Sequence, residues 1–114
     1  MKEITRAISI RQPYVELILQ GKKQKEFRSR KTHLRGRFYI YASLTPKSDP
    51  SAWRKSGKSP GGLPTGKIVG SVEIIACTPT SEGGFAYKLA KPRRLRSHLV
   101  PLNQPQPLFW FPQF

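Results

Sequence analysis

The stretch that decides the fold reads Gly21-Lys22-Lys23-Gln24-Lys25-Glu26-Phe27-Arg28 and follows a short apolar segment. Acidic residues are scarce, with 6 Asp and Glu against 21 Lys and Arg, so one carboxylate among four cations suggests a built site. In an extended segment Glu26 and Arg28 project to one face and Phe27 to the other. We expect the face with Phe27 to pack inside the protein, and the face with Glu26 and Arg28 to bind a ligand or to carry out catalysis. The alternative is an ordinary strand with a solvated ion pair of little energetic value.

The segments on either side of this stretch predict further short elements. Alternating isoleucines predict a strand over residues 5–10. Pro13 suits a first helical turn and Tyr14, Leu17 and Ile18 recur at helical spacing, so a helix is predicted around residues 13–20, with Gly21 as its left-handed stop. Residues 25–28 and 37–42, the latter opened by Gly36, predict two strands.

The second half of the chain alternates loops and strands. Residues 44–66 are rich in Pro, Gly and Ser and predict a loop, with either one helical turn around Trp53 or a mobile insertion. Residues 67–77 form the clearest strand pattern, and residues 108–111 predict a last, short strand. Between them we expect a helical turn over residues 85–89 and an extended basic segment over residues 91–96. These elements predict a small α+β fold that is mostly β.

Length and charge limit the functions that the chain can serve. With 114 residues we expect a single domain over 1–114 with a proline-rich C-terminal end. A net charge of +15 makes a polyanion the natural partner, because a surface built only for solubility would mix signs. An anionic membrane is disfavoured, since no apolar stretch approaches the roughly 18 residues needed to span one. Nucleic acid is therefore the preferred partner, either RNA or single-stranded DNA.

Cysteine, histidine and the N-terminal residues add exclusions. Cys77 is the only cysteine, so no internal disulfide can form, and it is expected to be a buried small hydrophobe. Charges interrupt every apolar run near the N-terminus, so we expect no signal peptide and an intracellular, cytoplasmic protein. His33 and His98 are far apart and have no partner at ligand spacing, so we expect neither metal nor cofactor.

The motif and its neighbours resemble a known family, the ASCH domain. The resemblance rests on the spacing of Gly21, Lys23, Glu26 and Arg28, together with residues 8–14 before it and 36–43 after it. It continues through residues 66–70 and 92–95 to the aromatic C-terminal end, so it covers nearly the whole chain. It implies a PUA-like fold, which is a compact mixed β-barrel with short helices, and relatives that bind RNA.

The same resemblance implies that Gly21, Lys23, Glu26 and Arg28 line a cleft between the first helix and the barrel. Lysine and arginine neutralise phosphate, and glutamate accepts a proton from a base, a ribose hydroxyl or water. Near this cleft we expect further contacts from the start of the helix and the end of a strand: Arg11, Gln12, Tyr14 and Ser43. Glu73 either supplies a second carboxylate or, as we prefer, forms a salt bridge with a neighbouring strand.

Two basic segments are expected to flank the cleft. The first, residues 22–37, includes Lys22, and the second, residues 88–96, includes Arg93, Arg94 and Arg96 as phosphate contacts. Most aromatic residues must fill the core of so small a domain. Trp53, together with Tyr14, is preferred as a stacking surface for bases because both lie in or beside loops.

Three functions remain open, and the first is preferred. The first is an RNA-binding module. The second is a metal-independent ribonuclease or a hydrolase of a modified nucleoside, with Lys23 as electrostatic stabiliser and Glu26 as general base. In the amidohydrolase branch of the family a threonine stands three positions after the motif lysine, and Glu26 occupies that position here. The third is a protein–protein adaptor that uses residues 101–112, and the oligomeric state is left open.

Overall fold

The structure is a computed structural model and describes residues 3–114. It contains six strands and two helices. In chain order these are β1 (Ala7–Ile10), α1 (Tyr14–Leu19), β2 (Lys25–Arg28), β3 (Gly36–Ala42), α2 (Pro50–Ser56), β4 (Lys67–Pro79), β5 (Phe85–Leu99) and β6 (Phe109–Trp110).

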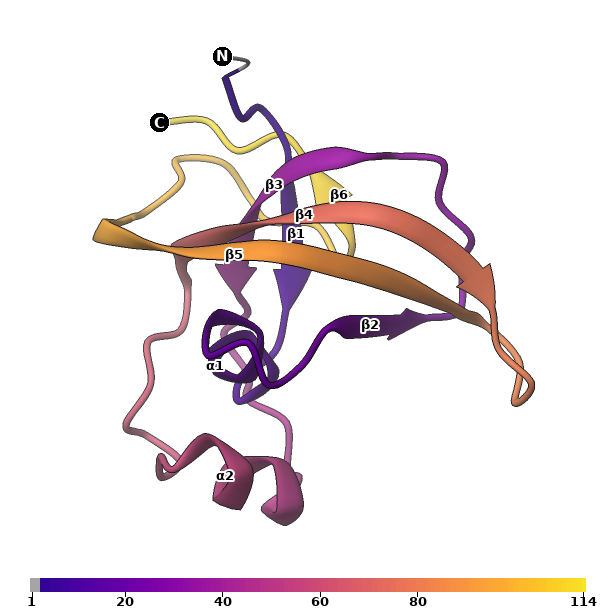
Figure 1. The fold of residues 1–114 in the computed structure, drawn as a ribbon. Helices are drawn as coiled ribbons and strands as arrows, with labels where there is room; N and C mark the ends of the chain where they lie inside the picture. The colour runs from indigo at the N-terminus through magenta and orange to yellow at the C-terminus, as the bar shows by residue number, and fades with distance from the viewer. Residues whose placement is uncertain (1–2) are drawn as a thin grey trace.

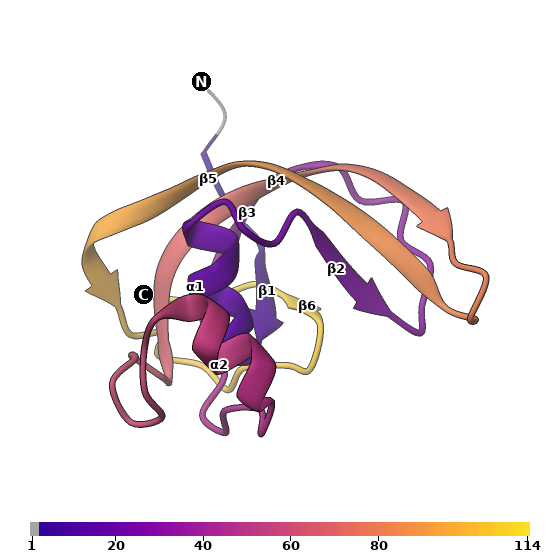
Figure 2. The same ribbon diagram turned by 60° about the horizontal axis from the view of Figure 1, so that its bottom comes forward.

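The six strands form one sheet in the order β2-β5-β4-β3-β1-β6. β1 pairs with β3 in parallel, and the other neighbours are antiparallel. The long strands β4 and β5 arch over α1, and α2 lies beyond α1 on the same side (Figure 1). Seen from below, the sheet curls into a half-barrel around α1 (Figure 2). The prediction of a small α+β fold with a mixed β-barrel and short helices is confirmed.

The main core lies between α1 and the concave side of the sheet. All four residues of β1 are buried because a strand on each side and the helix cover it. Val15 and Ile18 of α1 point into this core, where the ring of Phe109 stacks on that of Tyr87 at 6.0 Å between centroids. A helix of only 6 residues cannot be stable alone, so its buried face holds it in place.

The proline-rich C-terminal end packs onto the same domain. Trp110 is buried in a smaller cluster with Ala7, Tyr41 and Ile68, and its indole N–H donates to the Ser9 hydroxyl at 2.9 Å. Because β6 completes the sheet beside β1, the aromatic part of this end is engaged within the domain.

Several sequence-based elements need correction. Residues 85–89 do not form a helical turn but begin the 15-residue strand β5, because they pair with β4 and β2. The first strand begins at Ala7, not at residue 5. Within residues 44–66, the helical alternative around Trp53 is confirmed, since Trp53 lies in α2, which Asp49 caps by accepting the Ala52 N–H at 3.1 Å. Cys77, which was expected to be a buried small hydrophobe, is only half-buried.

Candidate nucleic-acid interface

A hollow of about 480 Å³ opens where β1, α1 and β2 meet. The polypeptide reverses direction just before it, at Gly21, whose φ of +78° is a left-handed conformation that glycine adopts without strain. This reversal brings β2 back to α1. The lining residues come from four separate stretches of the chain: Ser9, Arg11, Tyr14, Glu26, Arg28, Ser43, Leu44, Thr45, Lys47 and Pro107. We call this hollow the motif cleft.

Glu26 and Arg28 point into the motif cleft from β2, and their ion pair is more enclosed than the sequence suggested. Arg28 Nε donates to Glu26 Oε2 at 2.9 Å, and Glu26 is only 7% exposed. Lys23 Nζ lies 3.6 Å from Glu26 Oε1 at the edge of β2. The face assignment from sequence was wrong, because Phe27 is 59% exposed and lies on the outer side of the curled sheet. The Glu26 face is the inner one.

Arg28 joins three parts of the chain. Besides Glu26, its guanidinium donates to the Ser9 carbonyl at 2.6 Å and to the Pro107 carbonyl at 3.3 Å. These bonds tie β2 to the end of β1 and to the segment before β6. Arg28 is thus a structural clamp at the base of the cleft as well as one of its charged walls.

Arg11 and Tyr14 form the opposite wall and order the loop after β3. Arg11 donates through Nε to the Thr45 carbonyl at 2.8 Å and through Nη2 to the Pro46 carbonyl at 2.9 Å. Tyr14 donates its hydroxyl proton to Asp49 at 2.7 Å. Burial, together with this hydrogen bond, raises the pKa of Tyr14 to about 12, and the same bond lowers the pKa of Asp49. The phenol therefore stays neutral and fixed at physiological pH.

Five sequence-predicted residues line the motif cleft together: Arg11, Tyr14, Glu26, Arg28 and Ser43. Lys23 stands at its rim through the contact with Glu26. Lys22 points elsewhere and donates to the Lys55 carbonyl at 2.8 Å. Gln12 is 1% exposed and does not line the cleft, since its side chain bonds to Pro64 and to the Glu16 N–H.

Arg94 lines a different hollow, together with Glu16 and Leu19 of α1. It makes two hydrogen bonds with the buried carboxylate of Glu16, at 2.9 and 2.7 Å. These bonds lower the pKa of Glu16 and raise that of Arg94. Arg93 and Arg96 are exposed on β5, as Arg94 is, but neither of them lines this hollow. None of the three arginines lines the motif cleft, and within residues 3–114 only Arg94 among them is held in an ion pair.

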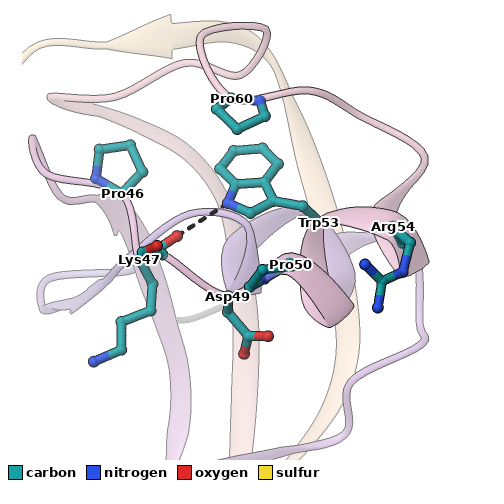
Figure 3. A pocket seen from close by; sticks show the side chains of 8 residues that line it. Pro46, Lys47, Asp49, Pro50, Trp53, Arg54 and Pro60 are labelled. Atoms are coloured by element: carbon teal, nitrogen blue, oxygen red, sulfur yellow. Dashed lines mark hydrogen bonds between the residues drawn. The ribbon is translucent and has the colours of Figure 1, made fainter.

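Trp53 also lies outside the motif cleft. It lines a neighbouring hollow of about 520 Å³ that shares Lys47 with the cleft. Pro46, Pro50 and Pro60 surround the indole, whose N–H donates to the Lys47 carbonyl at 3.0 Å (Figure 3). The side chain is 8% exposed, so little of its ring is open to a base.

Glu73 does not supply a second carboxylate to the cleft. It lies 3.3 Å from Arg37 and 3.9 Å from Lys91, so the predicted salt bridge to neighbouring strands is confirmed. The five ion pairs of residues 3–114 engage five different cations of the chain's 21. Most of the positive charge therefore remains available to a polyanion.

Sequence reasoning missed several lining residues. Asp49, which does not line the cleft but holds the Tyr14 hydroxyl, was detectable, because Asp followed by Pro50 is typical of a helix N-cap with proline at the first helical position. Ser9 and Pro107 had no local signal, since only the pairing of β6 with β1 brings residue 107 beside the motif.

The family model of the ASCH domain matches residues 8–93, and the chain belongs to this family. ASCH domains are PUA-like domains, a class that is generally linked to RNA binding. No curated protein matches the chain. Among residues 3–114, no helix is both long and apolar enough to cross a membrane.

Proposed function

We propose that this protein is a single-stranded RNA-binding module whose motif cleft holds one nucleotide. One observation carries the proposal. Arg11, Tyr14, Glu26, Arg28 and Ser43 come from distant segments, yet their side chains meet in one hollow on a chain of net charge +15. A hollow that combines cations, an aromatic ring and hydrogen-bond acceptors suits a splayed nucleotide.

The cations of the cleft suit the phosphate. Lys23 and Arg28 are partly exposed, and Arg11 uses Nε and Nη2 on loop carbonyls while its Nη1 donates to none of residues 3–114. These groups are therefore placed to donate charge-assisted hydrogen bonds to phosphate oxygens.

The acceptors of the cleft suit the ribose or the base. Arg28 holds Glu26 Oε2 with a hydrogen bond, whereas the 3.6 Å from Lys23 Nζ to Oε1 is longer than one. Oε1 is therefore able to accept a hydrogen bond from a ribose 2′-hydroxyl or a base amine. Since the 2′-hydroxyl distinguishes RNA from DNA, we expect RNA to bind more tightly than DNA of the same sequence.

Direct binding measurements test this proposal. A fluorescein-labelled ten-nucleotide single-stranded RNA and the matching DNA are titrated with protein in EDTA, by fluorescence anisotropy. Lys23→Ala should weaken RNA binding by about tenfold if it donates to phosphate. Lys31→Ala removes the same charge from an exposed lysine outside the cleft and should cost much less. Equal effects of the two substitutions, or no binding by the wild type, would refute the proposal.

A metal-independent ribonuclease is a second candidate, supported by the closeness of Lys23, at the rim of the cleft, to Glu26 inside it. A general base and a cation are the pair that such chemistry requires. Incubating the same RNA with wild type and Glu26→Gln in EDTA, followed by denaturing gels, separates the two functions. Cleavage that persists in EDTA and disappears in Glu26→Gln would make the protein an enzyme. If the RNA stays intact with both proteins, the ribonuclease is ruled out and the RNA-binding module remains the proposed function.

A further inference from the structure

Phe27 is a large apolar side chain that the fold leaves in solvent beside the motif cleft. It is 59% exposed, although burial of a phenylalanine contributes about 1.5–3 kcal/mol to stability. It belongs to β2, which is the edge strand of the sheet and pairs only with β5. The ring of Phe27 is therefore open to a partner at the free edge of the sheet.

Lys23 connects Phe27 to the cleft. Its Nζ lies 5.2 Å from the centroid of the Phe27 ring, 5.2 Å from that of the Tyr14 ring and 3.6 Å from Glu26 Oε1. Tyr14 is a wall of the cleft, whereas Phe27 lies outside it. An aromatic ring, a cation and a second aromatic ring thus form a continuous surface from the cleft to the outer side of β2.

Like charges stand next to Phe27 on the same face. Lys25 and Phe27 project to the same side of β2, and Lys25 lies directly opposite Lys88 of β5. Both lysines are exposed, and neither forms an ion pair with any of residues 3–114. Like charges directly opposite each other on paired strands are destabilising. A bound anion would relieve this repulsion.

A smaller hollow borders this surface along β5. It measures about 260 Å³, and Lys23 and Lys88 both line it together with Ile75, which is 46% exposed. The cations of the motif and those of the β2–β5 face therefore border one surface. A ring for stacking with cations on both sides is the arrangement by which proteins hold single strands.

We propose that the outer face of β2 is a second contact site for single-stranded RNA, where an unpaired base stacks on Phe27 and the adjoining phosphates lie against Lys25 and Lys88. The neighbouring nucleotide enters the motif cleft past Lys23, so this inference rests on the proposed function. The bound strand then crosses the free edge of the sheet, with one nucleotide inside the half-barrel and the next outside.

Phe111 offers a matched control for the test. It is 56% exposed, and the Arg6 guanidinium lies 4.9 Å from its ring centroid, so its exposure and its cation resemble those of Phe27. It does not line the motif cleft or the hollow beside Lys88. Phe27→Ala should weaken binding of the ten-nucleotide RNA about tenfold, whereas Phe111→Ala should leave it within about twofold. Equal binding by wild type and Phe27→Ala would overturn the inference.

Two further measurements separate stacking from a loss of folding or of charge. Phe27→Trp should bind as well as wild type, and its exposed indole should be quenched when RNA stacks on it, since Trp53 and Trp110 are buried. Lys25→Gln with Lys88→Gln should make the plot of log K against log salt shallower by about 0.7 for each phosphate that the protein no longer neutralises. An unquenched indole on the bound complex would also overturn the inference. If Lys23→Ala abolishes binding and Phe27→Ala does not, the cleft proposal survives and this one fails.

Discussion

Replacing Arg28 by alanine should destabilise the domain, because this side chain connects three segments of the fold. The substitution removes hydrogen bonds to Glu26 at 2.9 Å, to the Ser9 carbonyl at 2.6 Å and to the Pro107 carbonyl at 3.3 Å. The side chain is 21% exposed, so solvent replaces these donors only in part. The substitution also leaves Lys23 as the only cation beside the buried carboxylate of Glu26 among residues 3–114.

The size of the effect follows from these hydrogen bonds. A hydrogen bond to a charged group contributes about 1.5–3 kcal/mol, and bonds made by one side chain are not additive. The two short bonds dominate, because the third is long and exposed. We expect Arg28→Ala to lower the free energy of unfolding by about 2–4 kcal/mol. For a chain of this length that corresponds to a fall in Tm of about 10 °C or more.

Urea and thermal unfolding followed by circular dichroism measure this destabilisation. Arg28→Lys should recover only part of it, because an ammonium group cannot reach three acceptors in a planar arrangement. Arg93→Ala is the matched control, since Arg93 is exposed and makes no side-chain hydrogen bond or ion pair with residues 3–114, and it should change the free energy by less than about 0.5 kcal/mol. If Arg28→Ala is as stable as Arg93→Ala, the clamp role of Arg28 is wrong.

Three other substitutions probe separate parts of the structure. Because Arg94 holds the pKa of Glu16 below its ordinary value of 4.5, the pair stabilises the fold fully above that pH and loses its contribution as the pH falls through the lower, folded-state pKa. Wild type should therefore exceed Glu16→Gln in urea stability at pH 7, and the difference should vanish in acid; a constant difference would contradict this. Gly70→Ala should destabilise by about 1–3 kcal/mol in the same assay, since the added Cβ would lie 2.5 Å from the Arg93 carbonyl oxygen, and unchanged stability would contradict that close approach. Arg93→Ala with Arg96→Ala should weaken binding of all RNA sequences about equally and make its salt dependence shallower, and weakening confined to one sequence would indicate base readout instead.

Local sequence determined the elements whose signals are short-range. Alternation predicted β2, β3 and most of β4, and the combination of Pro13, helical spacing and Gly21 predicted α1. Gly21 has the left-handed φ that was predicted for it. Helices commonly end with a residue in this conformation, which glycine adopts easily because it has no Cβ. The motif spacing could also be recognised, because it depends only on neighbours in the chain, and the family resemblance that it carries implied the fold class.

The side of the sheet on which each face lies was decided by tertiary structure. Alternation tells which residues of β2 share a face, but not which face is inside. The sheet curls toward α1, so Glu26 is enclosed and Phe27 is left in solvent. Residues 85–89 were misread for a related reason, since five residues with apolar ends fit a helical turn as well as a strand. Pairing with β4 and β2 selects the strand.

The contacts that build the candidate site are mostly long-range. Arg28 bonds to Pro107, which is 79 positions away, and Arg94 bonds to Glu16, which is 78 positions away. No local pattern encodes such pairs, because they form only after β5 and β6 have taken their places in the sheet. The sequence by itself therefore identified the motif and its charge, and it predicted a polyanion as the partner. Only the tertiary structure shows which residues line the cleft and which, like Arg94, bond to α1. These side chains are far apart in the sequence and meet only when the strands pair.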